Sequence, residues 1–430
     1  MSAATSTLPR AAIDAKLVAM ASATAVGVGV ALAGFVQNEP APYELYMVAL
    51  IGIWALFGIT ISRATVPLLV LWIIYLIGGM VSMTQMSDLQ DTPLYLAVTA
   101  FLALTAVFFA AIIEKREGLL QPIFIGWTLA ACLTGILGIL GYFGAFPGAD
   151  RFTLYDRAAG AFKDPNVFGP FLVLPAIWLL YGIITGRLMK MPVQAAGLLI
   201  LSFAIFLSFS RGAWGLYGLS AITVCAIVFL NSSSNRLRLR ILVMALIGIG
   251  LIALAVMIAL QIPQVATLFE TRAQLVQDYD GARLGRFARY GIGFALAMER
   301  PLGIGPLVFG QIFGEDTHNI WLKALMDYGW LGFAAYATLL VLTVAAGFRI
   351  LLRNRKWQPF LLCAWVVFVG HIALGTVIDM DHWRHFYLLM GIIWGCVGLE
   401  ARHQARHSEA SARETVAPRN YALALHRPNN

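Results

Sequence analysis

The chain has 430 residues, of which 60% are hydrophobic and only 12% are charged, with a net charge of +8. This composition is typical of a membrane protein, and a cluster of ionic side chains in such a chain indicates a site. The excess of basic residues falls in short loops between apolar runs, so it indicates membrane topology and does not require a nucleic-acid surface.

Apolar runs long enough to cross a hydrocarbon core of roughly 30 Å, which takes about 20 residues, recur along the chain. They fall at 17–36, 44–62, 66–84, 92–113, 121–144, 167–185, 193–209, 212–230, 239–260, 328–350, 358–378 and 383–399. Backbone groups in lipid must satisfy their own hydrogen bonds, and no alternating β-barrel pattern is visible, so each run predicts a helix. We therefore expect an all-α polytopic membrane protein of about twelve transmembrane helices.

Basic residues occur in alternate loops, which sets the predicted orientation because cytoplasmic loops are enriched in Lys and Arg. The basic loops carry Arg63; Lys115 and Arg116; Arg187 and Lys190; Arg236, Arg238 and Arg240; and Arg349, Arg353, Arg355 and Lys356. We expect both termini to be cytoplasmic and the long loops 145–166 and 261–327 to face outward. Residues 1–400 form the predicted membrane domain, and the polar segment 401–430 is predicted to be a disordered cytoplasmic tail.

Arg211 lies in the sequence LSFSRGAWG (207–215), between two apolar runs and on the predicted outer side. An interfacial arginine can simply extend its guanidinium out of the lipid. The other basic clusters between spans are predicted to be cytoplasmic, so an outer arginine runs against the topology rule. Its planar fork can donate two parallel hydrogen bonds to one phosphate, which makes Arg211 a candidate anion-binding residue.

The long outer loop contains a predicted helix that begins near Arg286 and ends before Pro301. One face of this helix carries Phe287, Tyr290, Phe294 and Ala297. Arg283, Arg286 and Arg289 recur at every third position, so neighbouring arginines share one side. That basic side could bind lipid headgroups without specificity or form part of a site. The following glycines in GIGP (303–306) permit a tight turn.

His318 opens a further predicted helix, HNIWLKALMDYGWLGF (318–333). The helix dipole disfavours a cation at a helix start, so a histidine there tends to remain neutral. A neutral imidazole can accept a proton, as a general base near pH 7 must. A lone histidine is more often structural, but the adjacent Asn319, the later Asp327 and the two outer arginines favour a functional role.

Two other outer segments carry polar residues. Asp164 and Asn166 end the 145–166 loop, where either could cap the next helix. The turn IDMDHWRHFY (378–387) contains two aspartates, two histidines and Arg384. Its spacing matches no specific metal motif, so an Asp–Arg ion pair within the turn is the preferred interpretation.

Taken together, these motifs resemble the O-antigen ligase and polymerase superfamily of bacterial inner-membrane glycosyltransferases. The resemblance rests on DPN (164–166), SRGA (210–213), Arg286 upstream of PLGIG (301–305), and His318 and Asn319 followed by Leu322, Asp327 and Gly329. It covers roughly 160–340 by motif and the whole chain by topology. The acidic position after the histidine motif is Asp327, where the family more usually has Glu, and Lys323 in the same helix is unexpected.

The resemblance implies transfer of a glycan from an undecaprenyl-diphosphate-linked donor to an acceptor hydroxyl at the periplasmic face, with inversion and without a metal ion or cofactor. His318 matches the proposed catalytic base, and Arg211 and Arg286 match the arginines thought to hold the diphosphate. Arg289, Asn319, Asp327, Asp164 and Asn166 are candidate accessory residues. The acceptor would be lipid A–core for a ligase, or another lipid-linked oligosaccharide for an O-antigen or exopolysaccharide polymerase.

Two other classes of protein fit about a dozen helices, namely a transporter and a scaffold without catalysis. A transporter commonly places charged groups near the middle of the membrane, whereas the spans here are nearly free of charge. A scaffold needs no arginine and histidine together on the outer side. The sequence therefore favours the transferase.

Overall fold

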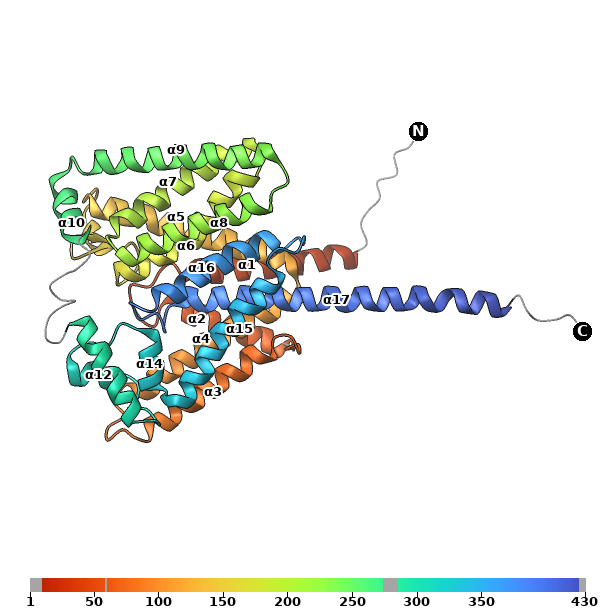
Figure 1. Ribbon diagram of the computed structural model, residues 1–430, viewed down its shortest axis with the longest axis horizontal. Coiled ribbons are helices and arrows are strands. Elements are labelled where there is room, and N and C mark those ends of the chain that lie inside the picture. Colours follow the sequence, from red (N-terminus) through yellow and green to blue (C-terminus); the bar gives the residue numbers. More distant parts are fainter. Residues whose placement is uncertain (1–9, 59, 274–284, 425–430) are drawn as a thin grey trace, which may run out of the picture.

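The computed structural model describes the backbone of residues 10–58, 60–273 and 285–424 as an all-α bundle (Figure 1). In this part of the chain, nine apolar helical segments have at least 18 residues and can cross a membrane. They contain α1 (Arg10–Leu32), α3 (Val66–Met83), α4 (Thr92–Lys115), α5 (Leu120–Tyr142), α6 (Pro165–Thr185), α7 (Met191–Leu207), α8 (Arg211–Asn231), α9 (Asn235–Ala259) and α15 (Gly329–Ile350).

Two shorter apolar helices, α2 (Pro42–Leu56) and α16 (Gln358–Leu374), and the long α17 (Arg384–Ala424) coincide with the other three predicted spans. The fold class predicted from the apolar runs is confirmed. The predicted tail differs, because α17 continues as a helix from its apolar part to Ala424. Residues 401–424 include seven Ala and four Arg, which are good helix formers.

The remaining elements lie between the apolar helices. The helical ones are η1 (Glu117–Leu119), η2 (Ala149–Phe152), η3 (Leu188–Lys190), α10 (Pro263–Ala273), α12 (Arg286–Glu299), α13 (Val308–Phe313) and α14 (Ile320–Asp327). Two short antiparallel strands, β1 (Thr153–Leu154) and β2 (Arg157–Ala158), pair in the loop before α6, with Thr153 opposite Ala158. Apart from η1 and η3, which lie in short basic loops, these elements stand where the sequence predicts the two long polar loops.

The apolar half of α17 runs through the centre of the bundle and packs against α4, α15 and α16 (Figure 1). Close approach to α4 depends on two glycines one turn apart. A Cβ on Gly391 would lie 2.8 Å from the carbonyl oxygen of Ala106, and one on Gly395 would lie 2.6 Å from the Cβ of Ile113. Small residues at this spacing let two membrane helices pack backbone to backbone.

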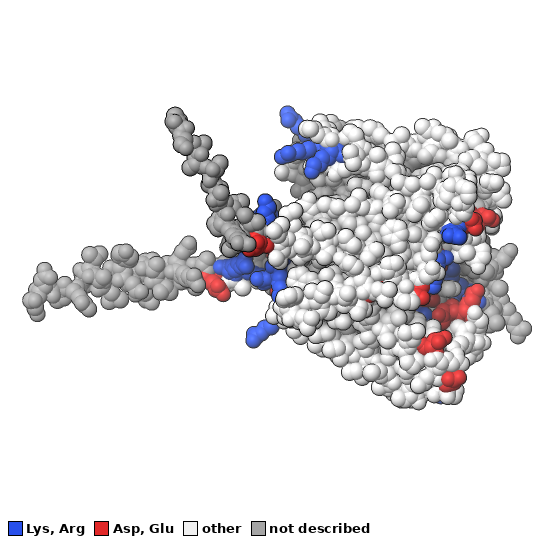
Figure 2. Space-filling view, turned by 180° about the vertical axis from the view of Figure 1, so that it is seen from behind, with Lys and Arg blue, Asp and Glu red and all other residues white. Residues whose placement is uncertain are grey.

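Charged side chains gather at the two ends of the bundle and leave the belt between them uncharged on the face shown (Figure 2). Both described ends of the chain project from one end, where Arg353 and Arg355 bind Glu400 at 2.6 and 2.9 Å (Figure 1). The β1–β2 loop, α12, α14 and the connection from α16 to α17 lie at the opposite end (Figure 1). The fold thus brings three separate polar segments together on one side.

The face of α12 that carries Phe287, Tyr290, Phe294 and Ala297 is only partly buried. Ala297 is buried and Tyr290 half-buried, but Phe287 and Phe294 are exposed. The buried contact instead uses the small residue Gly293, whose Cβ would lie 3.1 Å from Met326 and Thr317. α12 therefore lies against α14 through its small residues and leaves two phenylalanines outside.

Candidate functional site

His318 stands directly before α14, in the segment that joins α13 to this helix. The next residue, Asn319, caps α14, because its Oδ1 accepts hydrogen bonds from the N–H groups of Trp321 and Leu322 at 3.0 and 3.1 Å. The backbone of His318 has a φ of +52°, in the left-handed region that residues other than glycine rarely adopt. Such backbone strain, which costs about 1–3 kcal/mol, is concentrated at functional sites.

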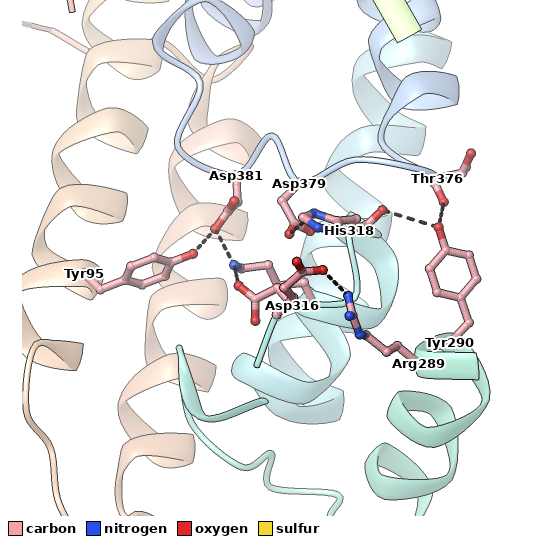
Figure 3. Close-up of polar contacts among 10 residues, drawn as sticks. Tyr95, Arg289, Tyr290, Asp316, His318, Thr376, Asp379 and Asp381 are labelled. Atoms are coloured by element: carbon pink, nitrogen blue, oxygen red, sulfur yellow. Dashed lines mark hydrogen bonds and ion pairs between the residues drawn. The ribbon is translucent and has the colours of Figure 1, made fainter. Parts of the chain in front are cut away.

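The imidazole of His318 faces Asp379 across two loops (Figure 3). Its Nδ1 lies 3.4 Å from Oδ2 of Asp379, which belongs to the connection between α16 and α17. The histidine side chain is 38% exposed and the aspartate only 17%. A carboxylate opposite Nδ1 favours the tautomer with a proton there, and this leaves the lone pair of Nε2 free to accept a proton.

Three segments are held together around this pair by hydrogen bonds to backbone carbonyl groups (Figure 3). The Tyr290 hydroxyl of α12 donates to the carbonyl of Thr376 at 3.0 Å and lies 3.5 Å from the carbonyl of His318. The Asn319 amide donates to the same Thr376 carbonyl at 3.0 Å. The N–H of Ile320 donates to the Gly375 carbonyl at 2.8 Å. The positions of His318 and Asp379 are therefore fixed by shared contacts.

The two arginines predicted to bind an anion each begin a helix near these segments. Arg286 is the first residue of α12, one turn before Tyr290 and on the same side of the helix. Arg211 is the first residue of α8, and a Cβ on the adjacent Gly212 would lie 2.6 Å from Leu374 at the end of α16. Both arginines are thus placed at the end of the bundle that holds His318.

Of the other two arginines on the predicted basic side, only Arg289 lies within the described residues. Arg289 is turned toward the loop before His318, where its Nη1 binds Oε2 of Glu315 at 2.6 Å (Figure 3). Arg283, which shares the predicted basic side of the helix, lies outside the described residues.

The accessory residues Asp164 and Asn166 have local structural roles. Asp164 caps α6, since its Oδ1 accepts a hydrogen bond from the Asn166 N–H at 2.7 Å, as the capping interpretation predicts. The Asn166 side chain accepts a hydrogen bond from Nη2 of Arg157 at 2.8 Å, and Nε of Arg157 donates to the Ser208 carbonyl at 2.7 Å. Arg157, which the motifs did not reveal, thereby ties the β1–β2 loop to the segment that carries Arg211.

Lys323, unexplained by the sequence motifs, is the centre of a buried ionic cluster. Its Nζ lies 2.9 Å from Oδ2 of Asp316 and 3.8 Å from Oδ2 of Asp381, and it stands over the ring of Tyr95 (Figure 3). Burial lowers the pKa of Lys323, but Asp381 and the other acidic groups outweigh it and raise the pKa well above its ordinary value. The ammonium is therefore charged in the folded protein.

The carboxyl groups around Lys323 respond in opposite ways. Burial would raise the pKa of Asp381, but Lys323, His382 and the Tyr95 hydroxyl together hold it below its ordinary value. Asp327, one turn after Lys323 on α14, is only 2% exposed, and its Oδ2 has no hydrogen-bond partner among the described residues. Burial raises the pKa of Asp327 well above the ordinary range, because Lys323 offsets this effect only in part.

The raised pKa of Asp327 predicts that the stability of the folded protein depends on pH. The folded protein holds this proton more tightly than the unfolded chain, so the stabilisation is present below an unfolded pKa of about 4 and is lost as pH rises through the folded pKa. Asp327→Asn should therefore reduce the loss of thermal stability between about pH 5 and pH 9. Melting temperatures of detergent-purified protein across this range check the prediction, and an unchanged slope would contradict it.

The prediction of an Asp–Arg ion pair within the turn 378–387 is wrong. Arg384 instead binds Glu44, at the start of α2, through a short hydrogen bond and lies 3.3 Å from Glu39. The physical reason is that α17 begins at Arg384 and directs this side chain toward α2, while Asp379 and Asp381 face α14. Among the side chains that the structure describes, no three His, Cys, Asp or Glu residues are arranged to hold a metal ion.

The turn at GIGP packs against the end of α14, where α15 begins. Gly303 has a φ of +89°, and a Cβ there would lie 2.7 Å from the Met326 carbonyl. The Ile304 N–H donates to that carbonyl at 2.8 Å, and the Gly305 N–H donates to Ser82 of α3 at 2.8 Å. The glycines of this motif thus form the predicted tight turn, and their role is to dock the loop onto the membrane helices.

The fold and this site define a polytopic membrane protein with a histidine–carboxylate pair and two arginine-bearing helix starts at one end. Residues 196–337 match the model of the O-antigen ligase family. The matched segment contains Arg211, Arg286 and His318 but ends before Asp379. No curated protein matches the chain at a significant level. The family consists of glycosyltransferase-like membrane enzymes, the ligases and polymerases.

Proposed function

We propose that the protein transfers a glycan from a lipid diphosphate donor to an acceptor hydroxyl at the end of the bundle opposite its termini. The observation that carries the proposal is the pairing of His318 with Asp379 at 3.4 Å, beside the helix starts that bear Arg211 and Arg286. The O-antigen ligase family match supports the same class of reaction. The donor of the proposal is a glycan linked to undecaprenyl diphosphate, and lipid A–core is the acceptor.

In this reaction the acceptor oxygen forms a bond to the anomeric carbon while the bond from that carbon to the diphosphate oxygen breaks. His318 takes the hydroxyl proton on Nε2, because Nδ1 faces the carboxylate of Asp379. The electron pair of the broken bond leaves with the lipid diphosphate. A single displacement of this kind inverts the configuration at the anomeric carbon.

The charge that develops on the diphosphate needs fixed positive groups in a partly dehydrated site. Arg211 and Arg286 can supply them as bidentate hydrogen-bond donors. Each arginine is also the first residue of its helix, where the helix dipole favours an anion. In the proposal these groups, and not a metal ion, balance the leaving group.

The site faces the periplasm in this proposal. The short loops at the end with both termini are rich in Lys and Arg, which is typical of the cytoplasmic side. The site lies at the other end, and a transporter would more commonly hold ionic groups halfway along the spans. The inner bacterial membrane, with both termini in the cytoplasm, is the corresponding location.

Reconstitution of the purified protein tests the proposed reaction. Proteoliposomes with a lipid-diphosphate-linked glycan and lipid A–core should accumulate the glycosylated acceptor and free lipid diphosphate in equal amounts. Passage of the intact donor across the bilayer without bond formation would support a transporter instead. In a deletion strain, loss of all capped lipopolysaccharide indicates a ligase, whereas single-repeat capping or loss of a secreted polymer indicates a polymerase.

Asp379→Asn tests the part of the site that the sequence motifs did not identify. The substitution removes the negative charge that orients His318 and stabilises its imidazolium form. A hydrogen bond to a charged group contributes about 1.5–3 kcal/mol, so kcat should fall by roughly tenfold to a hundredfold. KM for the lipid-linked donor should remain unchanged, because Asp379 does not contact the diphosphate in this proposal. A wild-type kcat in the folded variant would remove Asp379 from the mechanism.

A further inference from the structure

The role of Lys323 follows from where its two carboxylate partners stand in the chain. Asp316 lies two residues before His318, and Asp381 lies two residues after Asp379. The ammonium therefore joins the segment that carries the histidine to the segment that carries its carboxylate partner (Figure 3). Lys323 itself is 6% exposed and comes from α14, between the two segments.

Burying an ammonium is costly, and the cost is offset only when its partners are close and well placed. The Asp316 contact of 2.9 Å meets this condition, and Asp381 is in turn held by the Tyr95 hydroxyl and by the Tyr387 hydroxyl, which donates to its backbone carbonyl at 2.5 Å. These tyrosines belong to membrane helices α4 and α17. The cluster thus anchors both loops to the rigid bundle.

We propose that Lys323 is a positioning residue, whose bridge between Asp316 and Asp381 holds His318 and Asp379 within reach of each other. This inference rests on the proposed transfer reaction and assigns Lys323 no contact with substrate. The strained φ of His318 supports it, because a residue in the left-handed region returns to ordinary backbone geometry unless its surroundings hold it there. With the ammonium removed, no positive charge joins the two carboxylates, and the loops separate.

Lys323→Met removes the charge and keeps most of the volume. The variant should lower kcat by about a hundredfold, since a displacement of about 1 Å at a reacting group costs this much. KM for the lipid-linked donor should stay within about twofold of wild type, because the arginine-bearing starts of α8 and α12 are not bridged by the cluster. Lys190→Met, an exposed lysine at the opposite end, is the matched control and should behave as wild type.

The decisive variant combines Lys323→Met with Asp316→Asn and Asp381→Asn. Removing an ion pair together with its counter-charges is often neutral, whereas removing one partner is strongly destabilising. The triple variant should therefore accumulate in the membrane and regain most of the transfer rate lost in Lys323→Met. A triple variant that does not accumulate, or that transfers no better than Lys323→Met, would overturn the proposal, and so would wild-type kcat in Lys323→Met.

His318→Ala, measured beside these variants, separates this inference from the proposed function. If His318→Ala is inactive and Lys323→Met is fully active, the transfer mechanism holds and only the positioning role of Lys323 fails. If His318→Ala transfers like wild type, the proposed base itself fails, whatever the lysine variants show.

Discussion

Replacing His318 by alanine should lower the rate of glycan transfer by about 10²–10⁴-fold, the contribution typical of a general base. The acceptor hydroxyl has a pKa far above neutrality, so its attack needs a group that removes the proton as the new bond forms. The variant should still insert, because His318 precedes the cap of α14 and its side chain is 38% exposed. Transfer from the lipid-linked donor, measured in proteoliposomes at equal protein, checks the result.

The alanine substitution also has a conformational control. His318 has a φ of +52°, in the left-handed region. A substitution by a residue that tolerates this backbone conformation therefore separates the loss of the imidazole from any effect on the backbone. His318→Asn tolerates it and lacks a proton acceptor of comparable basicity, so it should be as inactive as the alanine variant. His407→Ala, an exposed histidine on α17 far from the site, should keep full activity. Normal transfer by folded His318→Asn would refute the assignment of the base.

The fold could be predicted from the sequence because a bilayer imposes a single strong requirement. Every apolar run of sufficient length must be a helix, and even the two shortest runs, 193–209 and 383–399, coincide with α7 and the first part of α17. The tail 401–430 was predicted to be disordered from its polar composition, whereas α17 continues to Ala424, where Ala and Arg favour a helix. The exposure of Phe287 could not be predicted, since helical spacing identifies a face but not its partner.

The candidate site could be predicted only where a residue type and its place in the loop already implied chemistry. His318 and Arg211 stood out for that reason. In the sequence, Asp379 was only one of several polar residues in the turn 378–387. It lies 61 positions after His318, and the two residues meet only because the segment after α16 lies beside the start of α14. Lys323 was visible only as an unexpected charge in its helix, and Arg157 gave no signal, because a buried ionic contact is a property of tertiary packing and not of local sequence.

Arg211→Lys should lose nearly as much activity as Arg211→Ala, with a fall in kcat of about 10²–10³-fold, the loss typical when one donor to a developing oxyanion is removed. A lysine ammonium is a point charge on a flexible stem, and it cannot reproduce the two parallel hydrogen bonds that a guanidinium donates to a phosphate. The helix itself should be unaffected, since the cap of α8 is the Ser210 side chain, which accepts from the Ala213 N–H at 3.3 Å.

A comparison of the two substitutions decides what the guanidinium of Arg211 contributes. Arg187→Lys, an exposed arginine in a basic loop at the opposite end, is the matched control and should transfer normally. If Arg211→Lys also transfers normally, the residue acts only as a positive charge near the lipid surface, where either side chain serves. If Arg211→Lys instead fails while His318 is intact, the leaving group must accept the two parallel hydrogen bonds of a guanidinium. A diphosphate can accept them, whereas an uncharged glycan alone does not bind a guanidinium in this way.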